Sequence, residues 1–318
     1  MSTDAYPHDR STPHTSLVEV GGFSKSFGGR MALSLRSLSL DAGEVVGLLG
    51  ANGSGKTTCL RTLAGLLRPD TGRGSILGFD LLRDTTRIRR GVGYLSQQLS
   101  LYGSLSVREN LRFRADVYGL ADWPAAVETT MARFDLKAHE YRAVDTLSGG
   151  WARTVQLAAA LMHEPKLILL DEPTVGLDPS ARQSVWGHIM RFAADGRGVL
   201  LSTHDISDAC RCSRIVLLSQ GGIFATGTPA DLVAASSSKV LLVSGPGTLR
   251  CASLVQQLSG VLTTYPSGGN LRVLVNPGAV RLVTDFLRSR ELRVEPVEPS
   301  FEDAVFELTK HDPVGMPA

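Results

Sequence analysis

The chain has 318 residues, of which 43% are hydrophobic and 20% charged, and its formal net charge at pH 7 is +2. Its length predicts one large domain with a smaller one, or two of similar size, and its composition excludes a fibre or a chain disordered throughout. The small net charge argues against direct nucleic-acid binding, because such proteins usually carry a concentrated basic face.

The first predicted elements are a tail, two strands and a strand followed by a helix. Residues 1–16 are polar and predict a disordered N-terminal tail rather than a secretory signal. From Leu17 two stretches alternate apolar and polar residues, which predicts an antiparallel β start. A short buried strand at 44–49 then leads into GANGSGKTT and a helical segment that Pro69 closes.

The middle of the chain alternates helical and strand patterns. Apolar positions at helical spacing predict a small helical subdomain at about 98–160. LILLDEP and VLLSTH are typical of parallel strands buried on both faces, with a site at their C-terminal ends, and a crossover helix is expected at 179–194. After a serine linker at 236–238, a β-α-β-β-α-β order predicts a ferredoxin-like module and then a last helix.

A glycine-rich segment, GANGSGKT, stands between a predicted strand and a predicted helix, which is the setting of a phosphate-binding loop. Its glycines let backbone N–H groups curve around phosphate oxygens, and the positive end of the helix points at them. Lys56 is expected to bind the β and γ phosphates, Thr57 to bind Mg²⁺, and Thr58 to bond near the α phosphate. The alternative is a glycine-rich turn that happens to contain a lysine. The residues expected to bind ATP in this segment are Gly50, Asn52, Gly53, Ser54, Gly55, Lys56, Thr57 and Thr58.

Two acids follow the apolar run at 167–170. Asp171 and Glu172 would lie at the tip of a buried strand, where carboxylates are costly unless they are paired or bind a metal. Asp171 is expected to bind Mg²⁺, directly or through water, and Glu172 to polarise the attacking water. Together with the upstream loop, this pair predicts a nucleoside triphosphatase.

The sequence LSGG at 147–150 lies between these two motifs, and with it residues 17–233 resemble ATPases of the ATP-binding cassette (ABC) type. Gln97 in GYLSQ resembles the Q-loop of that family, Asp178 in GLDP the D-loop and His204 in STH the H-loop. Phe27 stands where the family stacks an aromatic ring on adenine. Each residue alone would more often be structural, so the joint pattern carries the resemblance.

The resemblance implies that ATP lies between the phosphate loop of one domain and the LSGG of another. Since the chain has one set of motifs, it is expected to pair with an identical copy, which creates two composite sites. Ser148 and the N–H groups of Gly149 and Gly150 would bind the γ phosphate held by the partner, and Asp178 would contribute to the ATP site. The implied catalytic residues are Glu172, His204 and Gln97, and the implied Mg²⁺ ligands are Thr57, Gln97 and Asp171.

The chain departs from the family after LSGG. It has Trp151, Ala152, Arg153 and Thr154, where the family commonly places Gln or Lys followed by an Arg near position 154. This departure questions the hydrogen bonding that supports the helix after LSGG, and with it the hydrolysis rate, but leaves the γ-phosphate contacts in place.

The segment PSFEDAVFEL at 299–308 is similar to the closing segment of ATPase subunits of ABC-2-type exporters, including drug and antibiotic self-resistance pumps. An amphipathic helix that packs Phe301, Val305 and Leu308 onto the domain is the structural interpretation, and both can hold. The expected fold class is α/β: a P-loop ABC ATPase domain with a parallel core sheet, an antiparallel β subdomain and a helical subdomain, plus a small ferredoxin-like α+β module. The expected boundaries are 1–16 for the first tail, 17–235 for the ATPase domain, 239–310 for the accessory domain and 311–318 for the last tail.

The cysteines and the apolar runs indicate where in the cell the protein is expected to lie. Cys59, Cys210, Cys212 and Cys251 lack the spacing of a zinc site and are too few for a disulfide framework, which indicates a reducing cytoplasm. No apolar run approaches the roughly 20 residues that span a bilayer, so a peripheral place at the cytoplasmic face of the membrane is expected.

The main hypothesis is the ATP-hydrolysing subunit of an ABC-2-type exporter, a homodimer that powers a separate transmembrane permease. The alternative is a non-transport ABC ATPase that acts on ribosomes or DNA. That class typically carries two ATPase domains in one chain or a long coiled-coil insertion, and the sequence shows neither. A non-hydrolysing regulatory module is a third possibility, which the intact Lys56, Asp171, Glu172 and His204 oppose.

Overall fold

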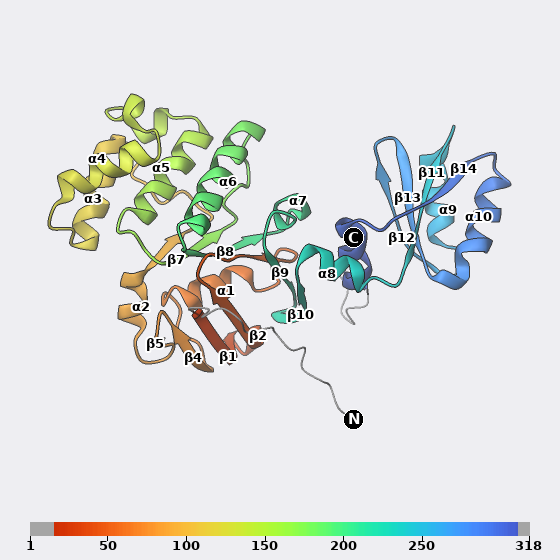
Figure 1. Ribbon diagram of the computed structural model, residues 1–318, viewed down its shortest axis with the longest axis horizontal. Coiled ribbons are helices and arrows are strands. Elements are labelled where there is room, and N and C mark those ends of the chain that lie inside the picture. The colour runs from red at the N-terminus through yellow and green to blue at the C-terminus, as the bar shows by residue number, and fades with distance from the viewer. Residues whose placement is uncertain (1–15, 311–318) are drawn as a thin grey trace.

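The protein is described here by a computed structural model of residues 16–310 (Figure 1). The predicted tail at 311–318 and residues 1–15 of the predicted first tail lie outside the described residues. Ser16 is not part of a tail, because it pairs with Asp41 of the neighbouring strand. Among residues 16–310, no helix combines the length and apolar character needed to cross a bilayer.

An antiparallel sheet begins the chain, as the alternating pattern predicts. Its buried positions, such as Val18, Val20 and Leu35, face a core, while the residues between them are mostly exposed or half-buried. Gly28 and Gly29 make the first turn with positive φ angles of 55° and 79°, the backbone that a tight two-residue hairpin requires. In sheet order the strands are β2 (Arg30–Asp41), β1 (Ser16–Phe27), β4 (Thr71–Ile76) and β5 (Phe79–Asp80).

The central sheet is parallel except for its edge strand β10, which runs antiparallel to β9. Every residue of β3, β7 and β8 is buried, because one face packs on the antiparallel sheet and the first helix, and the other packs on later helices. In sheet order the strands are β10 (Gly222–Gly227), β9 (Arg214–Ser219), β3 (Val45–Leu49), β8 (Gly198–Thr203), β7 (Leu167–Asp171) and β6 (Val92–Leu95).

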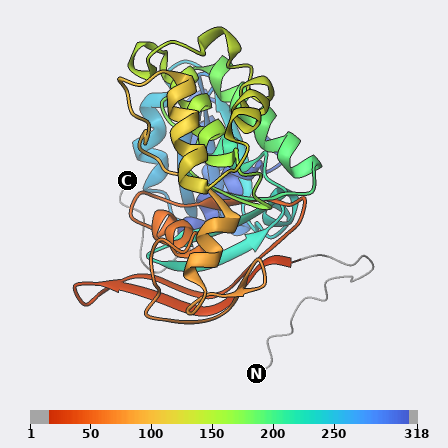
Figure 2. The ribbon, with the colours of Figure 1, turned by 90° about the vertical axis from the view of Figure 1, so that its left-hand side faces the viewer.

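Helices cover both faces of this sheet. Helices α3, α4 and α5 form the predicted helical subdomain, which Figures 1 and 2 show at the end opposite the antiparallel sheet. A capping box between Ser106 and Glu109 begins α3, and Gly119 ends it. Pro124 does not interrupt a helix, because it lies in the first turn of α4, where a missing N–H costs nothing. The helices are α1 (Lys56–Leu63), α2 (Thr85–Gly91), α3 (Val107–Tyr118), α4 (Trp123–Arg133), α5 (Gly149–Leu161), α6 (Pro179–Ala194), α7 (Ile206–Ala209) and α8 (Pro229–Ala234), with short 3₁₀ turns at Lys137–His139 and Val144–Thr146.

A third sheet follows the serine linker and has the predicted β-α-β-β-α-β order. All its neighbouring strands are antiparallel, and its apolar face packs on helices α9 and α10 through Val243, Val273 and Leu287. This arrangement confirms the ferredoxin-like module. In sheet order the strands are β12 (Val261–Ser267), β13 (Asn270–Val275), β11 (Lys239–Ser244) and β14 (Arg293–Val297), and the helices are α9 (Ala252–Gln256) and α10 (Val280–Arg288), preceded by 3₁₀ turns at Thr248–Cys251 and Pro277–Ala279.

The last helix, α11 (Phe301–Lys310), lies between the two halves of the molecule (Figure 1). Phe301 and Val305 are buried in the same core as β9 and α8, and Leu308 packs against it. The fully buried Asp303 instead accepts hydrogen bonds from Arg272 and Tyr265 of the third sheet. Helix α11 therefore joins the third sheet to the central one, although the sequence assigns it to the accessory domain at 239–310.

Glu307 attaches the same helix to the linker. Its buried carboxylate accepts hydrogen bonds from the backbone N–H groups of Ser237 (3.0 Å) and Ser238 (3.2 Å), and from the hydroxyls of Ser236 and Ser237. Burial alone would raise the pKa of Glu307, but these hydrogen bonds outweigh it and lower the pKa to about 2. The linker at 236–238 is therefore held in one conformation by an ionised carboxylate.

We expect Glu307→Ala to lower the free energy of unfolding by about 2 kcal/mol, because the donors of the linker lose a charged acceptor. Glu307→Gln tests the charge alone. Since the folded pKa lies below the ordinary value of 4.5, the stabilisation is present above pH 4.5 and is lost as the pH falls toward 2. Urea denaturation should thus give a difference between parent and Glu307→Gln that shrinks over this range. The exposed neighbour Glu302, changed to Gln, is the control, and an equal effect there would contradict the role of Glu307.

Candidate functional site

The phosphate-binding loop connects the end of β3 to the start of α1. Gly53 and Gly55 have φ angles of 83° and 102°, which favour glycine. A Cβ atom on Gly50 would lie 2.3 Å from the carbonyl oxygen of Leu218, and one on Gly55 would lie 2.8 Å from that of Ala32. Glycines are therefore required at these places because neighbouring backbone approaches closely.

Lys56 is almost buried at the first position of α1. Its Nζ donates to the carbonyl oxygens of Gly50 (2.7 Å) and Ala51 (3.1 Å) and lies 3.7 Å from Oε1 of Glu172. Burial lowers the pKa of Lys56, while the nearby carboxylates of Glu172 and Asp171 oppose that change. A cation held at the mouth of a loop of N–H groups is suited to an anion such as a phosphate.

Ser54 gives a second indication of a ligand. Its hydroxyl is buried in the loop and has no hydrogen-bond partner among the described residues. Buried polar groups are nearly always paired, so an orphaned hydroxyl beside Lys56 fits a site that a polar ligand completes. The residues of the loop thus fit the phosphates of a nucleotide.

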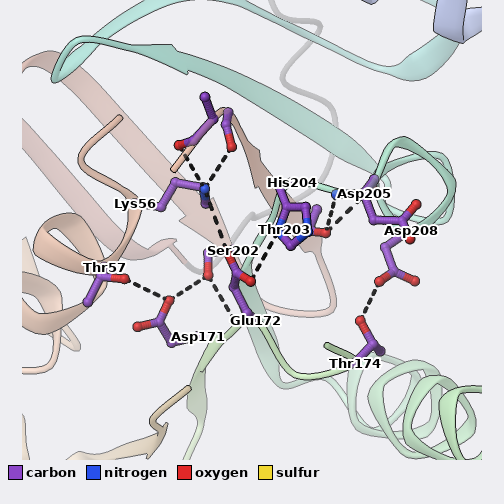
Figure 3. A network of polar contacts seen from close by, with 12 residues as sticks. Lys56, Thr57, Asp171, Glu172, Thr174, Ser202, Thr203, His204, Asp205 and Asp208 are labelled. Atoms are coloured by element: carbon purple, nitrogen blue, oxygen red, sulfur yellow. Dashed lines mark hydrogen bonds and ion pairs between the residues drawn. The ribbon is translucent and has the colours of Figure 1, made fainter. Parts of the chain in front are cut away.

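Thr57, Asp171 and Ser202 form a linked set of oxygen atoms (Figure 3). Thr57 Oγ1 donates to Asp171 Oδ1 at 3.1 Å, and Ser202 Oγ donates to the same oxygen at 2.7 Å. Hydroxyl and carboxylate oxygens are the ligands that Mg²⁺ prefers, and this ion usually takes one or two of them from a protein and the rest from water and phosphate. Residues 16–310 contain no cluster of three or more His, Cys, Asp or Glu side chains fit for a metal.

Glu172 lies between a cation and a histidine (Figure 3). Its buried carboxylate faces Lys56 with one oxygen, while the other lies 3.1 Å from Nδ1 of His204, a side chain that is 47% exposed. The backbone of Glu172 has a φ of 47°, which residues other than glycine seldom adopt. A carboxylate held this way presents its oxygen atoms in a defined direction next to the phosphate loop.

The short helix α7 after His204 is fixed by a buried acid. Asp208 accepts hydrogen bonds from Trp186 Nε1 (2.6 Å) and Arg182 Nε (2.9 Å) of α6, and from the hydroxyl of Thr174, which follows Glu172. This network connects the segments that carry His204 and Glu172. The sequence analysis did not single out these residues, because their contacts join three separate elements.

Several predicted residues are not joined to this cluster. Ser148 and Gly149 are exposed at the start of α5, where Ser148 Oγ accepts from Trp151 N, and Phe27 is 52% exposed. Asp178 caps α6 by accepting from the N–H groups of Ser180 and Ala181. The structure thus brings together Lys56, Thr57, Asp171, Glu172 and His204, but not Phe27, Gln97, Ser148, Gly149, Gly150 and Asp178. The roles of all these residues stay predictions.

Two further residues are supplied by the tertiary structure alone. Ser202 lies opposite Asp171 in the register of β7 and β8, and its Oγ also accepts from the N–H of Glu172 at 2.9 Å. Arg153, which the sequence presents as a departure from the family, is buried and donates to backbone carbonyls around the site. The doubt over hydrogen bonds after LSGG is therefore resolved, because Arg153 supplies them.

A cavity of about 260 Å³ adjoins the phosphate loop on the side of α11. The loop residues 50–54 and His204 form one wall, and Val305, Phe306 and Thr309 of α11 contribute to the other. Helix α11 therefore reaches the nucleotide side of the central sheet, which the sequence did not predict.

Comparison with known proteins identifies the family. Residues 33–175 match the family model described as ABC transporter. The protein named "Probable multidrug ABC transporter ATP-binding protein YbhF", from Escherichia coli (strain K12), is 39% identical over 229 residues, which are 71% of this chain but 40% of that protein. This chain thus spans about two fifths of that relative's length.

Other relatives match over most of their length. The Daunorubicin resistance ATP-binding protein DrrA3 of Streptomyces coeruleorubidus is 36% identical and aligns with 77% of this chain and 79% of its own. The Nod factor export ATP-binding protein I of Rhizobium etli is 33% identical over 92% of this chain and 93% of its own, so that alignment includes most of the third sheet.

Solved structures share the fold over about two thirds of this chain. A structure described as an ATP-binding subunit of an ABC transporter has 33% identity and a TM-score of 0.62, and covers 69% of this chain and 92% of its own. A dimeric post-hydrolysis state of an ATP-binding cassette, bound to ADP and Pi, has 27% identity and a TM-score of 0.61, and covers 66% and 98%.

We expect Ser202→Ala to lower the free energy of unfolding by about 1–3 kcal/mol, because the buried N–H of Glu172 and the carboxylate of Asp171 lose a partner. Ser37→Ala, at an exposed position of β2, is the matched control. Urea denaturation of both variants checks the expectation. Equal stability of the parent and Ser202→Ala would show that the hydrogen bonds of Ser202 are dispensable.

Proposed function

The chain belongs to the ABC transporter family as one of its ATP-hydrolysing proteins, and from that premise we propose that it works as a dimer that powers a separate membrane permease. The observation that carries the proposal is the position of Glu172. Its buried carboxylate lies 3.7 Å from Lys56 and 3.1 Å from His204, beside the oxygens of Asp171 and Thr57. A phosphate-binding cation and a proton acceptor thus face the same space.

The phosphate loop binds the triphosphate, and Lys56 places its charge on the β and γ phosphates. Thr57 and Asp171 hold Mg²⁺, with Gln97 as a further ligand. Mg²⁺, when bound, neutralises charge on the phosphate oxygens during transfer.

Glu172 orients the attacking water and accepts its proton. His204 Nδ1 donates a hydrogen bond to Oε2 of Glu172, which keeps that carboxylate directed at the water and leaves Nε2 facing the phosphate. Position and electrostatics together account for the rate increase in such a reaction, because phosphoryl transfer needs little covalent chemistry from the protein.

The dimer follows from the place of LSGG. Ser148 and Gly149 are exposed at the positive end of the 13-residue helix α5, and no contact within residues 16–310 joins them to Lys56. A twofold pair places this helix end against the nucleotide of the partner, with Phe27 stacked on adenine. The dimeric post-hydrolysis cassette among the similar structures supports this arrangement.

Export is the direction that the relatives favour. The relatives above are named for daunorubicin resistance and Nod factor export, and the latter aligns with most of the third sheet as well. With a permease on a separate chain, this protein acts at the cytoplasmic face of the membrane.

Glu172→Gln should lower ATP hydrolysis by about 100-fold or more, because the amide cannot accept the proton of the water. MgATP should still bind and hold the variant as a dimer in size-exclusion chromatography. Adding Ser148→Arg should abolish that ATP-dependent dimer, since LSGG then cannot reach the partner's phosphate. Glu295→Gln, on an exposed strand position, is the control. Hydrolysis at the parent rate by Glu172→Gln would remove Glu172 from the role of base.

A tagged chain purified from gently solubilised membranes of its own cells should bring down a membrane protein with several spans. The same preparation from cells with an untagged chain is the control, and mass spectrometry identifies the partner. Recovery of ribosomal or DNA-bound proteins without a membrane protein would contradict the transport function and favour the non-transport alternative.

A further inference from the structure

Arg153 occupies the centre of the contacts between the helix after LSGG and the rest of the site. It lies one turn into α5, and its side chain is 7% exposed. All its hydrogen bonds go to uncharged oxygen atoms, and five of the six acceptors are backbone carbonyls. They run from Nε to Pro173 O (3.0 Å), from Nη1 to Ser96 O (2.8 Å), Gln97 O (3.1 Å) and Gln156 Oε1 (2.8 Å), and from Nη2 to Asp171 O (3.1 Å) and Glu172 O (2.8 Å).

A buried guanidinium of this kind is costly unless every donor is paired. Burial lowers the pKa of Arg153 to about 10, while the carboxylates of Asp171 and Glu172 oppose that change. The group therefore keeps its charge at neutral pH. All three nitrogen atoms of the guanidinium have acceptors, so the surrounding backbone fixes the position of the Arg153 side chain. The same hydrogen bonds hold that backbone in place.

The first segment is the acidic end of β7. Glu172 has its backbone in the left-handed region, at a φ of 47°, which a non-glycine residue keeps only when its surroundings hold it there. Arg153 binds the carbonyl oxygen of Glu172 and those on either side, at Asp171 and Pro173. Ser202 binds the N–H of Glu172 from the opposite direction. The conformation that directs the Glu172 carboxylate is thus held from two sides.

The second segment is the loop that carries Gln97. Arg153 binds the carbonyl oxygens of Ser96 and Gln97, and Gln156, one turn further along α5, donates to the carbonyl oxygen of Gln98 at 2.8 Å. Arg153 and Gln156 both belong to α5, the helix that begins at LSGG. A displacement of that helix is therefore transmitted to the Gln97 loop and to the Glu172 backbone through the same guanidinium.

We propose that Arg153 is a positioning residue that fixes the Glu172 backbone and the Gln97 loop in one arrangement with the LSGG helix. The inference rests on the proposed function, in which Glu172 is the base, but concerns a residue that contacts no substrate. The role of Arg153 depends on both the planar arrangement of its donors and its charge, since its three nitrogen atoms bind five backbone carbonyls at once.

Two variants separate these properties. Arg153→Lys keeps the charge but concentrates its donors on one nitrogen atom, which cannot reach carbonyls on both segments. Arg153→Gln keeps polarity without charge. Arg191→Gln, at an exposed position of α6, is the matched control. Melting temperatures establish that each variant is folded before the other measurements are compared.

Hydrogen–deuterium exchange of the nucleotide-free protein is the direct test, because it needs neither ATP nor hydrolysis. We expect faster exchange in peptides that cover 95–99 and 171–175 for Arg153→Lys and Arg153→Gln, and parent-like exchange for Arg191→Gln. MgATP binding should change by less than about threefold, whereas kcat should fall by about 100-fold, as small displacements of a catalytic group do. Arg153→Lys should not restore kcat.

Parent-like exchange in both segments together with parent-like kcat in Arg153→Lys would overturn the proposal, even if Glu172→Gln is inactive. Weakened MgATP binding with unchanged kcat would also overturn it, because Arg153 would then support the phosphate loop. Active Glu172→Gln with faster exchange in the Arg153 variants would refute the base role while leaving the positioning of the two segments supported. The two hypotheses can therefore fail separately.

Discussion

The burial of opposite charges at the end of the central sheet is the constraint on which the rest of the structure depends. Lys56, Asp171 and Glu172 are each 6% exposed or less. Such charges are tolerated only as partners, because an isolated buried charge costs several kcal/mol. Strands β3, β8 and β7 lie side by side in that order. The loop after β3 leads to Lys56 at the start of α1, β7 ends at Asp171 with Glu172 next, and β8 carries Ser202. The buried strands surround this group, which fits the phosphates of a nucleotide.

The surrounding elements are arranged to hold that edge in place. Asp208 ties α7 to α6 and to Thr174, and Arg153 ties α5 to Glu172. Both are buried charged groups whose partners come from distant parts of the chain. Helix α11 connects the third sheet in the same way, because its buried Asp303 binds Arg272 of that sheet while its Val305 lies in the core of the central one. Its Phe306 lines the cavity beside the phosphate loop, so the third sheet is connected to the site by one helix.

Sequence reasoning agrees with the structure where the fold depends on local pattern. The loop at 50–57 needs glycines and a lysine in consecutive positions, and the apolar run before Asp171 marks a buried strand by its composition alone. It was less complete after LSGG, where Arg153 reads as a departure from a motif although it satisfies five carbonyls. It also assigned α11 to the accessory domain, because an amphipathic helix does not reveal which of two cores receives its apolar face.

The sequence by itself determined the strand, glycine-rich loop and helix at 45–63, the buried strand that ends at the two acids, the family and the order of elements in the third sheet. Each of these depends on neighbouring residues or on a regular period of apolar residues. Only the tertiary structure decided that Ser202 lies opposite Asp171, that His204 lies 3.1 Å from Glu172, and that Arg153 holds Glu172. Those contacts join residues separated by about twenty to thirty positions in the chain. Strand order and helix packing bring them together, and no local pattern carries that information.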